Sequence, residues 1–320
     1  MAYKVGAGSS CQAAKQSAWG TSVKPNTLIN MTSESISVSV EKGDEGNLLA
    51  SKTANQRDLM SIGVSGSIST VLRPEFADWL FECGLGTKTE NTYTLANPNT
   101  DLPVSTIVMS RGGIVKTYPD VTIKSIKISA AAQDYVKADI DLVGVDEVSQ
   151  AQDGAQLLQA GLSFKLPSYR CTQATLLYGD GNSTSPSTKL CVESCDITID
   201  NGIEDSPATY CTGVYSGRPV MGLRSVTVDF SIPYSENVDA FKSKYYSALA
   251  SPCVSLKLVF TTSDTDENIE ILMPNVNITS ADGNVGGTGI IDSSFSGEAL
   301  SVGVTEPIKI TVHHKASEAA

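Results

Sequence analysis

The sequence of 320 residues has only two histidines, His313 and His314, both beside the C-terminus. Basic residues are also scarce: 23 Lys and Arg stand against 35 Asp and Glu, for a formal net charge of −12. The shortage of histidine excludes most His-based catalysis and most His-ligated metal sites. The shortage of cations argues against a protein that grips nucleic acid, because phosphate binding needs clustered Lys and Arg. It leaves open a protein past which nucleic acid slides.

Long apolar runs are absent as well. No stretch of 18 apolar residues occurs, so no membrane-spanning helix is predicted. The segment from Met1 to Trp19 lacks the apolar core of a signal peptide, so we expect the chain to fold in a cytosol. The seven cysteines, an odd number, are then expected to be mostly reduced thiols.

The chain contains what reads as an internal repeat. The segment from Ser33 to Gly43 resembles that from Val192 to Gly202, because both alternate apolar and polar residues and close with an acid and a glycine. In each half a polar stretch and a second alternating strand follow, around Val64–Thr70 and Val226–Ile232. A third match aligns 125–129 with 275–279. Three matches in the same order favour a duplication over the general likeness of β-sandwiches.

Each half also predicts one helix. Pro74 suits a first helical turn, an apolar stripe follows at Phe76, Trp79, Leu80 and Cys83, and Gly84 is the expected end. In the second half Ser235 is the expected N-cap, followed by a stripe at Val238, Phe241, Tyr245 and Leu249. Between Ile123 and Ile126 the alternation slips by one residue, which predicts a bulge at Lys124 or Ser125.

These patterns predict an α+β, mainly β fold of two tandem β-sandwich domains with one short helix each. The predicted domains are residues 1–150, which include an N-terminal arm, and residues 151–320, with the join near 148–158.

Motifs for catalysis and metal binding are weak. Asp264-Thr-Asp-Glu-Asn268 lacks the glycine and the final glutamate of a calcium loop. Cys191 and Cys195 with the two histidines have atypical spacing for zinc, and Cys195 is better explained as a small buried hydrophobe. We therefore predict no catalytic, cofactor-binding or metal-binding residues.

The predicted strand faces opposite the apolar residues are unusually poor in cations. They carry small hydroxyls and carboxylates, which suit a smooth surface that repels polyanions. The residues assigned to this surface are Ser35, Ser37, Ser39, Glu41, Ser65, Ser67, Asp139, Asp141, Asp196, Thr198, Asp200, Thr227 and Asp229.

Read in order, several short segments resemble the tail tube proteins of long-tailed bacteriophages. They are Trp19-Gly-Thr21, Met31-Thr-Ser-Glu-Ser-Ile36, Val64-Ser-Gly-Ser-Ile68, Arg73-Pro74, Leu102-Pro103, Gly112-Gly113 and Ile126-Lys-Ile-Ser-Ala130. The resemblance covers roughly residues 19–144 directly and the second half through the repeat. Each segment is weak alone, and their order is the specific part.

The resemblance implies a structural subunit, not an enzyme, that forms rings whose inner sheets join into one barrel. Stacked rings would enclose an acidic channel, lined by the thirteen residues above, that conducts viral DNA without specific binding. A duplicated fold implies trimeric rings with pseudo-sixfold symmetry. Implied partners are further copies of the chain, the tape measure protein, and the tail terminator and distal tail proteins; the implied location is the virion tail, assembled in the host cytoplasm.

Two long polar stretches, 43–61 and 202–224, exceed the length usual for hairpin loops. The resemblance implies contacts with neighbouring subunits and rings there, through Asp44, Asn47, Arg57, Asp205, Tyr215 and Arg218. Two other classes remain open from the residues alone: a β-sandwich adhesin or receptor-binding protein, and a hydrolase with a carboxylate site.

Overall fold

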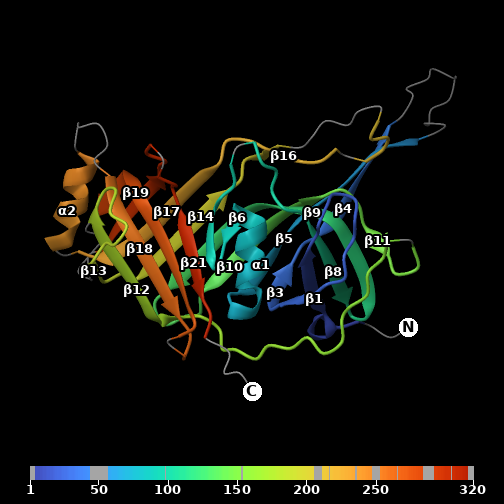
Figure 1. Cartoon of the computed structure of the whole chain (residues 1–320), viewed down its shortest axis with the longest axis horizontal. Coiled ribbons are helices and arrows are strands. Elements are labelled where there is room, and N and C mark those ends of the chain that lie inside the picture. The colour runs from blue at the N-terminus through green and yellow to red at the C-terminus, as the bar shows by residue number, and fades with distance from the viewer. Residues whose placement is uncertain are drawn as a thin grey trace, which may run out of the picture.

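The computed structural model describes residues 4–43, 57–97, 99–152, 154–204, 211–215, 217–234, 236–246, 253–264, 266–283, 292–303 and 305–315. Antiparallel strands dominate it (Figure 1). The elements up to residue 149 are η1 (Gly6–Gly8), β1 (Ser10–Lys15), β2 (Thr27–Ile29), β3 (Met31–Glu34), β4 (Ser37–Gly43), β5 (Asp58–Val71), α1 (Pro74–Leu85), β6 (Gly86–Thr89), β7 (Thr92–Leu95), β8 (Ser105–Arg111), β9 (Ile114–Ala131), β10 (Lys137–Gly144) and β11 (Val148–Ser149). The later elements are β12 (Arg170–Asp180), β13 (Thr188–Leu190), β14 (Ser194–Asp200), β15 (Ile203–Glu204), β16 (Val220–Met221), β17 (Ser225–Pro233), α2 (Glu236–Tyr245), β18 (Cys253–Thr261), β19 (Asn268–Gly283), β20 (Asp292–Ala299) and β21 (Lys309–His313).

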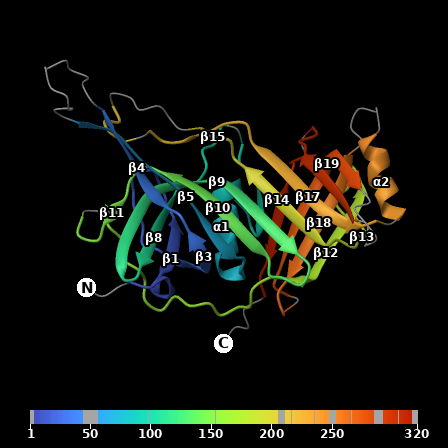
Figure 2. The same cartoon turned by 180° about the vertical axis from the view of Figure 1, so that it is seen from behind.

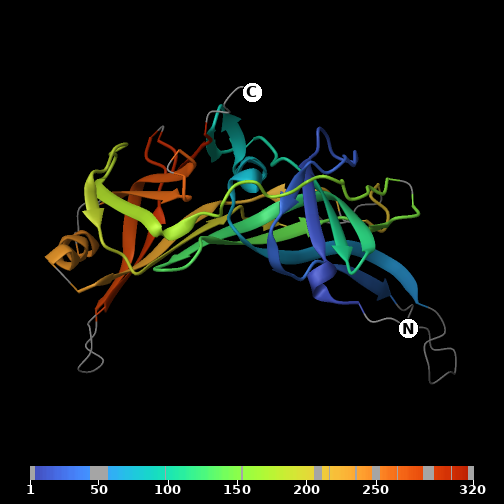
Figure 3. The same ribbon diagram turned by 90° about the horizontal axis from the view of Figure 1, so that it is seen from below.

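Eight strands form one continuous antiparallel sheet, which we call the central sheet. Their order is β4–β5–β10–β9–β14–β17–β20–β19, four strands from each half of the chain. The ribbon views show α1 on one side of this sheet, and Figure 2 shows the sheet from the opposite side. From below, its long strands run across the molecule beneath α1 (Figure 3). Because β9 pairs with β14, the two halves share one sheet.

The outer strands follow the same order in both halves. One series is β2–β1–β8–β9 and the other is β13–β12–β18–β19. The long strands β9 and β19 belong to both layers, since their first parts pair with outer strands and their last parts with the central sheet. On the outer side β21 pairs with both β19 and β7, which ties the halves together again.

A bulge interrupts each long strand where it enters the central sheet. In β9 the register with β10 skips Lys124, which confirms the bulge predicted there. In β19 the register with β20 skips Thr279. A bulge bends its strand and increases the local twist, so it allows one strand to serve two layers.

Helix α1 begins at Pro74 as predicted and buries Phe76, Trp79, Leu80 and Cys83. The predicted end at Gly84 is wrong: the helix continues to Leu85, and Gly86 takes the left-handed conformation with φ of 98°. Gly84 instead allows close packing, because a Cβ at this position would collide with the side chain of Ile126.

Helix α2 packs against β19 through Val238 and Phe241, which are fully buried as predicted. The predicted place of Tyr245 in the apolar stripe is wrong, because this side chain is 42% exposed and its ring lies tilted against that of Tyr246, with the ring centres 5.2 Å apart. The expected N-cap Ser235 and the last stripe residue Leu249 lie outside the described residues.

The strand registers refine the internal repeat. Val64 pairs with β4 as Val226 pairs with β14, which agrees with the second sequence match. Ser37, however, lies opposite Ser65, and its counterpart opposite Thr227 is Thr198, not the Asp196 that the first match aligned with it. The third match is also displaced, because the bulges place Ser125 with Ser280. Alternation has a period of two, so it cannot detect a slip of two residues.

The segment between the halves is docked along the first half. Gln156 exchanges hydrogen bonds with Thr117, and Gln159 exchanges them with Gln12 at 2.7 and 3.0 Å. Farther on, the amides of Lys165 and Leu166 donate to Glu75 of α1. The division into domains of residues 1–150 and 151–320 remains a prediction, because this segment packs on the first half although it lies mostly beyond the predicted join.

Candidate functional site

One face of the central sheet is polar along its whole width. Side chains directly opposite one another in an antiparallel pair point to the same face. The registers therefore place twelve of the thirteen residues predicted for a polar surface on one face, which we call the polar face. Ser35, just before β4, joins them, because its hydroxyl lies 3.0 Å from that of Ser67. The row Thr227–Thr198–Lys127–Asp139–Ser69 crosses from the second half to the first without interruption.

The opposite face is apolar and packs against α1 and the outer strands. Its side chains include Ile68, Ile126, Ile140, Ile197, Ile199 and Val228, all fully buried. Strict alternation of these residues with serine, threonine and aspartate is what fixes the orientation of the sheet, because a one-residue slip would expose every apolar side chain.

The polar face is acidic, and Lys127 and Lys137 on it are each paired with an aspartate. Lys127 Nζ lies 2.9 Å from Asp196 Oδ2 across the β9–β14 junction. The hydrogen bond to Asp196 raises the pKa of Lys127, and the charges of Asp139 and Asp229 add to this effect. Lys137 pairs with Asp134 at 2.5 Å. Neither lysine offers an unpaired positive charge to a polyanion.

Sequence reasoning missed part of this face. Lys127 was not assigned to it, and neither was β20, which contributes Ser294, Ser296 and Glu298 opposite β17. The signal for β20 was present, because its buried residues alternate: Ser293, Phe295, Gly297 and Ala299. Two of these are serine and glycine, so the apolar alternation was faint.

The central sheet ends in two strands with an open edge. Within the described residues, β4 pairs with β5 alone, and β19 beyond Asn277 pairs with β20 alone. The β4–β5 hairpin also carries exposed apolar side chains, with Val40 47%, Leu59 41% and Met60 55% exposed. Open edges and apolar patches of this kind are typical of surfaces that meet another chain.

The polar stretch of the second half lies across the first half. The amide of Ile62 donates to the carbonyl of Val214 beside Tyr215, at 2.8 Å. Arg218 pairs with Asp101 at 2.8 Å and lies over the ring of Trp19. Tyr215 and Arg218, predicted for contacts between subunits, thus contact the first half of their own chain.

Of the remaining residues predicted for such contacts, Arg57 is exposed just before β5. Asp44, Asn47 and Asp205 lie outside the described residues. The assignment of these stretches to contacts between subunits or rings stays a prediction.

Two side chains of the second half cap the end of α1 in the first half. Asn201, fully buried, donates from Nδ2 to the carbonyls of Gly84 and Ile123 at 3.0 and 2.9 Å. Arg224 donates to the carbonyls of Gly84 and Leu85 at 3.3 and 3.1 Å. Burial lowers the pKa of Arg224 to about 10, although its charge suits the negative end of a helix.

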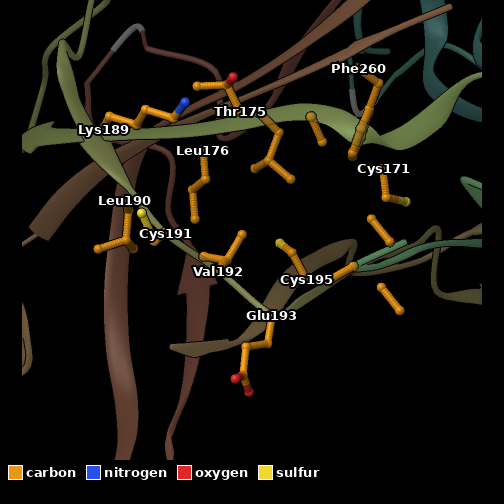
Figure 4. A pocket seen from close by; sticks show the side chains of 15 residues that line it. Cys171, Thr175, Leu176, Lys189, Leu190, Cys191, Val192, Glu193, Cys195 and Phe260 are labelled. Atoms are coloured by element: carbon orange, nitrogen blue, oxygen red, sulfur yellow. The ribbon is translucent and has the colours of Figure 1, made fainter. Parts of the chain in front are cut away.

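A cavity of about 230 Å³ lies between β12, β13 and β14 (Figure 4). Leu176, Val192 and Phe260 line it together with the thiols of Cys171 and Cys195, while the Glu193 carboxylate points away. Burial raises the pKa of Cys171 to about 11, and it raises the pKa of Cys195 further. These thiols are protonated and act as small hydrophobes, as predicted for Cys195.

All seven cysteines are free thiols. In the part of the chain that the structure describes, no group of three or more His, Cys, Asp or Glu side chains is arranged to hold a metal ion. None of the described helices has the length and apolar character needed to cross a membrane.

These features define a structural class of protein: a two-faced antiparallel sheet with a smooth acidic side and edges that can accept further strands. A family model described as phage tail tube protein matches residues 6–299, nearly the whole chain, and the chain belongs to this family. It is therefore a structural subunit of a phage tail, as the sequence resemblance predicted. No curated protein matches the chain.

Proposed function

We propose that three copies of the chain close into a ring, that rings stack into a tube, and that the polar face lines the channel through which viral DNA passes. The observation that carries this proposal is the continuous central sheet, which is polar on one face, apolar on the other, and open at both edges. A sheet that adds copies of itself at its open edges closes into a ring when the rotation between copies completes a full turn.

The dimensions support a channel wide enough for duplex DNA. Each chain contributes eight strands to the central sheet, so three chains supply twenty-four. At a spacing of ~4.8 Å and a tilt of about 45°, the backbone circumference is roughly 160 Å. The diameter is then about 50 Å, or roughly 40 Å once side chains are included.

The negative charge of the polar face favours the passage of DNA through the channel over its binding to the wall. DNA binds proteins largely by exchanging its counterions for Lys and Arg. Because Lys127 is paired with Asp196, the face offers DNA mainly carboxylates and hydroxyls. At physiological ionic strength the repulsion decays over about 8 Å, so DNA near the channel axis meets weak resistance without adhesion.

Within this proposal the partners are other copies of the chain, the tape measure protein inside the tube during assembly, and the tail terminator and distal tail proteins at the two ends. Assembly takes place in the host cytoplasm, and the mature location is the virion tail. DNA is a passing cargo without a specific binding site.

Electron microscopy and native mass spectrometry of the purified protein test the proposal. We expect tubes or rings, with three chains in each soluble ring. Six chains per ring would contradict the trimeric ring with pseudo-sixfold symmetry but would not contradict the proposed tube. Compact monomers at every concentration, without rings or tubes, would contradict the proposed function.

A further inference from the structure

The junction between the two halves shows how one unit of this sheet joins the next. β9 and β14 pair with Asp200 opposite Ser125, Thr198 opposite Lys127 and Asp196 opposite Ser129. At the start of this junction the amide of Asn201 donates to the carbonyl of the bulged residue Lys124, at 3.0 Å. On the apolar face, Ile199 meets Ile126 and both are fully buried.

The two open edges are the counterparts of these two strands. β4 is the counterpart of β14 in the repeat: Ser37 of β4 lies opposite Ser65 of β5, just as Thr198 of β14 lies opposite Thr227 of β17. β19 is likewise the counterpart of β9. The bulge at Thr279 interrupts the pairing of β19 with β20 at the position where the bulge at Lys124 interrupts the pairing of β9 with β10. Within the described residues, each chain therefore has one unpaired edge of the β14 type and one of the β9 type.

Within the described residues, side chains at both edges are less buried than their counterparts at the internal junction, which supports a missing partner strand. Val38, the counterpart of the fully buried Ile199, is only partly buried although it packs on the core. Ala281, the counterpart of Ile126, is likewise only partly buried. The edge segments 35–40 and 279–283 contain one charged residue, Asp282, whereas edge strands that must stay single usually carry several charges or a proline.

We propose that β4 of one chain pairs in antiparallel fashion with β19 of a second copy, in the register of the β9–β14 junction. This inference rests on the proposed ring. Ser37 lies opposite Asp282, Val38 opposite Ala281, and Ser39 opposite Ser280. The amide of Val40 donates to the carbonyl of Thr279, as Asn201 donates to Lys124 within the chain.

The new junction differs from the internal one in charge. Asp282 occupies the position of Lys127, and Ser35 that of Asp196, so the ion pair of the internal junction has no counterpart. A closed ring then carries this lysine–aspartate pair at its internal junctions only. In a ring of three chains the Lys127–Asp196 pairs are therefore arranged on the polar face with threefold and not sixfold symmetry.

Engineered disulfides test the register. Thr198 and Lys127 are directly opposite, and Cβ atoms of directly opposite residues lie about 4.5–5.5 Å apart, close enough for a disulfide after small adjustments. The test variant is S37C with D282C, in a background with the exposed Cys191 and Cys211 changed to serine. The controls, S39C with D282C and S37C with S280C, represent slips of two residues.

Assembled protein is treated with a mild copper–phenanthroline oxidant and analysed on non-reducing gels. We expect covalent dimers and trimers from the matched pair, formed at least tenfold faster than from either control. Faster cross-linking of a control in tubes seen by microscopy overturns the register and leaves the tube intact. Absence of rings and tubes from the unmodified protein overturns the proposed function and the junction together.

Proline variants give a second test that does not depend on thiols. The amide of Ser35 donates to Ser67 of β5, so by alternation the amides of Ser37 and Ser39 also face β5, and that of Val38 faces the open edge. V38P should remain folded by circular dichroism but lose tube formation. S37P should lower the melting temperature of the single chain, because it removes a bond to β5. Normal tubes from V38P overturn the proposal.

Discussion

The Nε2 atom of His314 lies 3.1 Å from both carboxylate oxygens of Asp78, and this contact joins the C-terminal end of the chain to α1. Nδ1 of the same ring lies 3.5 Å from Oε2 of Glu267, a carboxylate that is only 3% exposed. Tyr93 donates its hydroxyl to Asp78 at 2.6 Å, Lys88 is a cation near Asp78, and the backbone amide of Lys315 donates to Glu267 at 2.8 Å. The histidine thus bridges acids from both halves.

This bridge predicts a pH-dependent contribution to stability. The hydrogen bond to Asp78 raises the pKa of His314, so the contribution is present below pH ~6.5 and is lost as the pH rises through the higher folded value. Burial opposes the charge of Asp78, but His314 and Tyr93 lower the pKa of this carboxyl overall, so its contribution is lost only in acid. H314Q should lower the melting temperature of the unassembled chain by about 1–3 °C near pH 5.5 and by less at pH 8.5.

H313Q is the matched control for this measurement, because His313 lies 4.0 Å from Glu270 and contacts neither Asp78 nor Glu267 in the described contacts. Its melting temperature should follow that of the unmodified protein across the pH range. Equal effects of H314Q at pH 5.5 and pH 8.5 would contradict an ionic bridge.

Asn201 should contribute to the joining of the halves. N201A removes the amide that caps the carbonyls of Gly84 and Ile123, and leaves buried acceptors with fewer donors. We expect a loss of about 1–3 kcal/mol in the free energy of unfolding. N201D, which has the same shape but no donor, should cost at least as much in urea titrations. A neutral result for both variants would show that Arg224 alone caps the helix.

Gly66 lies in β5 where the backbone of Ser35 and Ile36 passes close by. Its φ is 153°, and a Cβ there would lie 2.5 Å from Cα of Ile36 and 2.6 Å from the carbonyl oxygen of Ser35. G66A should therefore cost about 2–3 kcal/mol of stability. In the control G6A the new methyl group meets nothing within 4 Å, so thermal denaturation should show little change.

Reversal of charge on the polar face tests its proposed place in the channel. A phage that carries D196K, D200K and D229K should assemble tails but deliver its genome slowly, more so at low salt, because lysines bind phosphate by releasing counterions. The control reverses Glu90, Asp180 and Asp266, three exposed acids outside this face. Infection at the normal rate, with normal tails seen by microscopy, would place the polar face elsewhere.

Much of the local structure followed from residue patterns alone. Pro74 marked the start of α1, alternation marked β5 and β17, and the interrupted alternation at Lys124 marked a bulge. These features depend on residues close together in the chain, so local sequence patterns can predict them. The order of the weak segments was also enough to identify the family.

Only the tertiary structure decided how the strands meet. The repeat is misaligned by two residues at β4, because alternation looks the same after an even shift. It is misaligned by five at β9, because the matched segment 275–279 ends at the bulge of β19, which shifts the alternation by one residue. The pairing of Lys127 with Asp196 and the docking of Arg218 on the first half join residues far apart in sequence. Such contacts depend on the register of strands across the sheet, which no local pattern contains. Thus the sequence by itself determined many of the local elements and the family, and the fold decided how the strands pair and which further residues, such as Lys127, share the polar face.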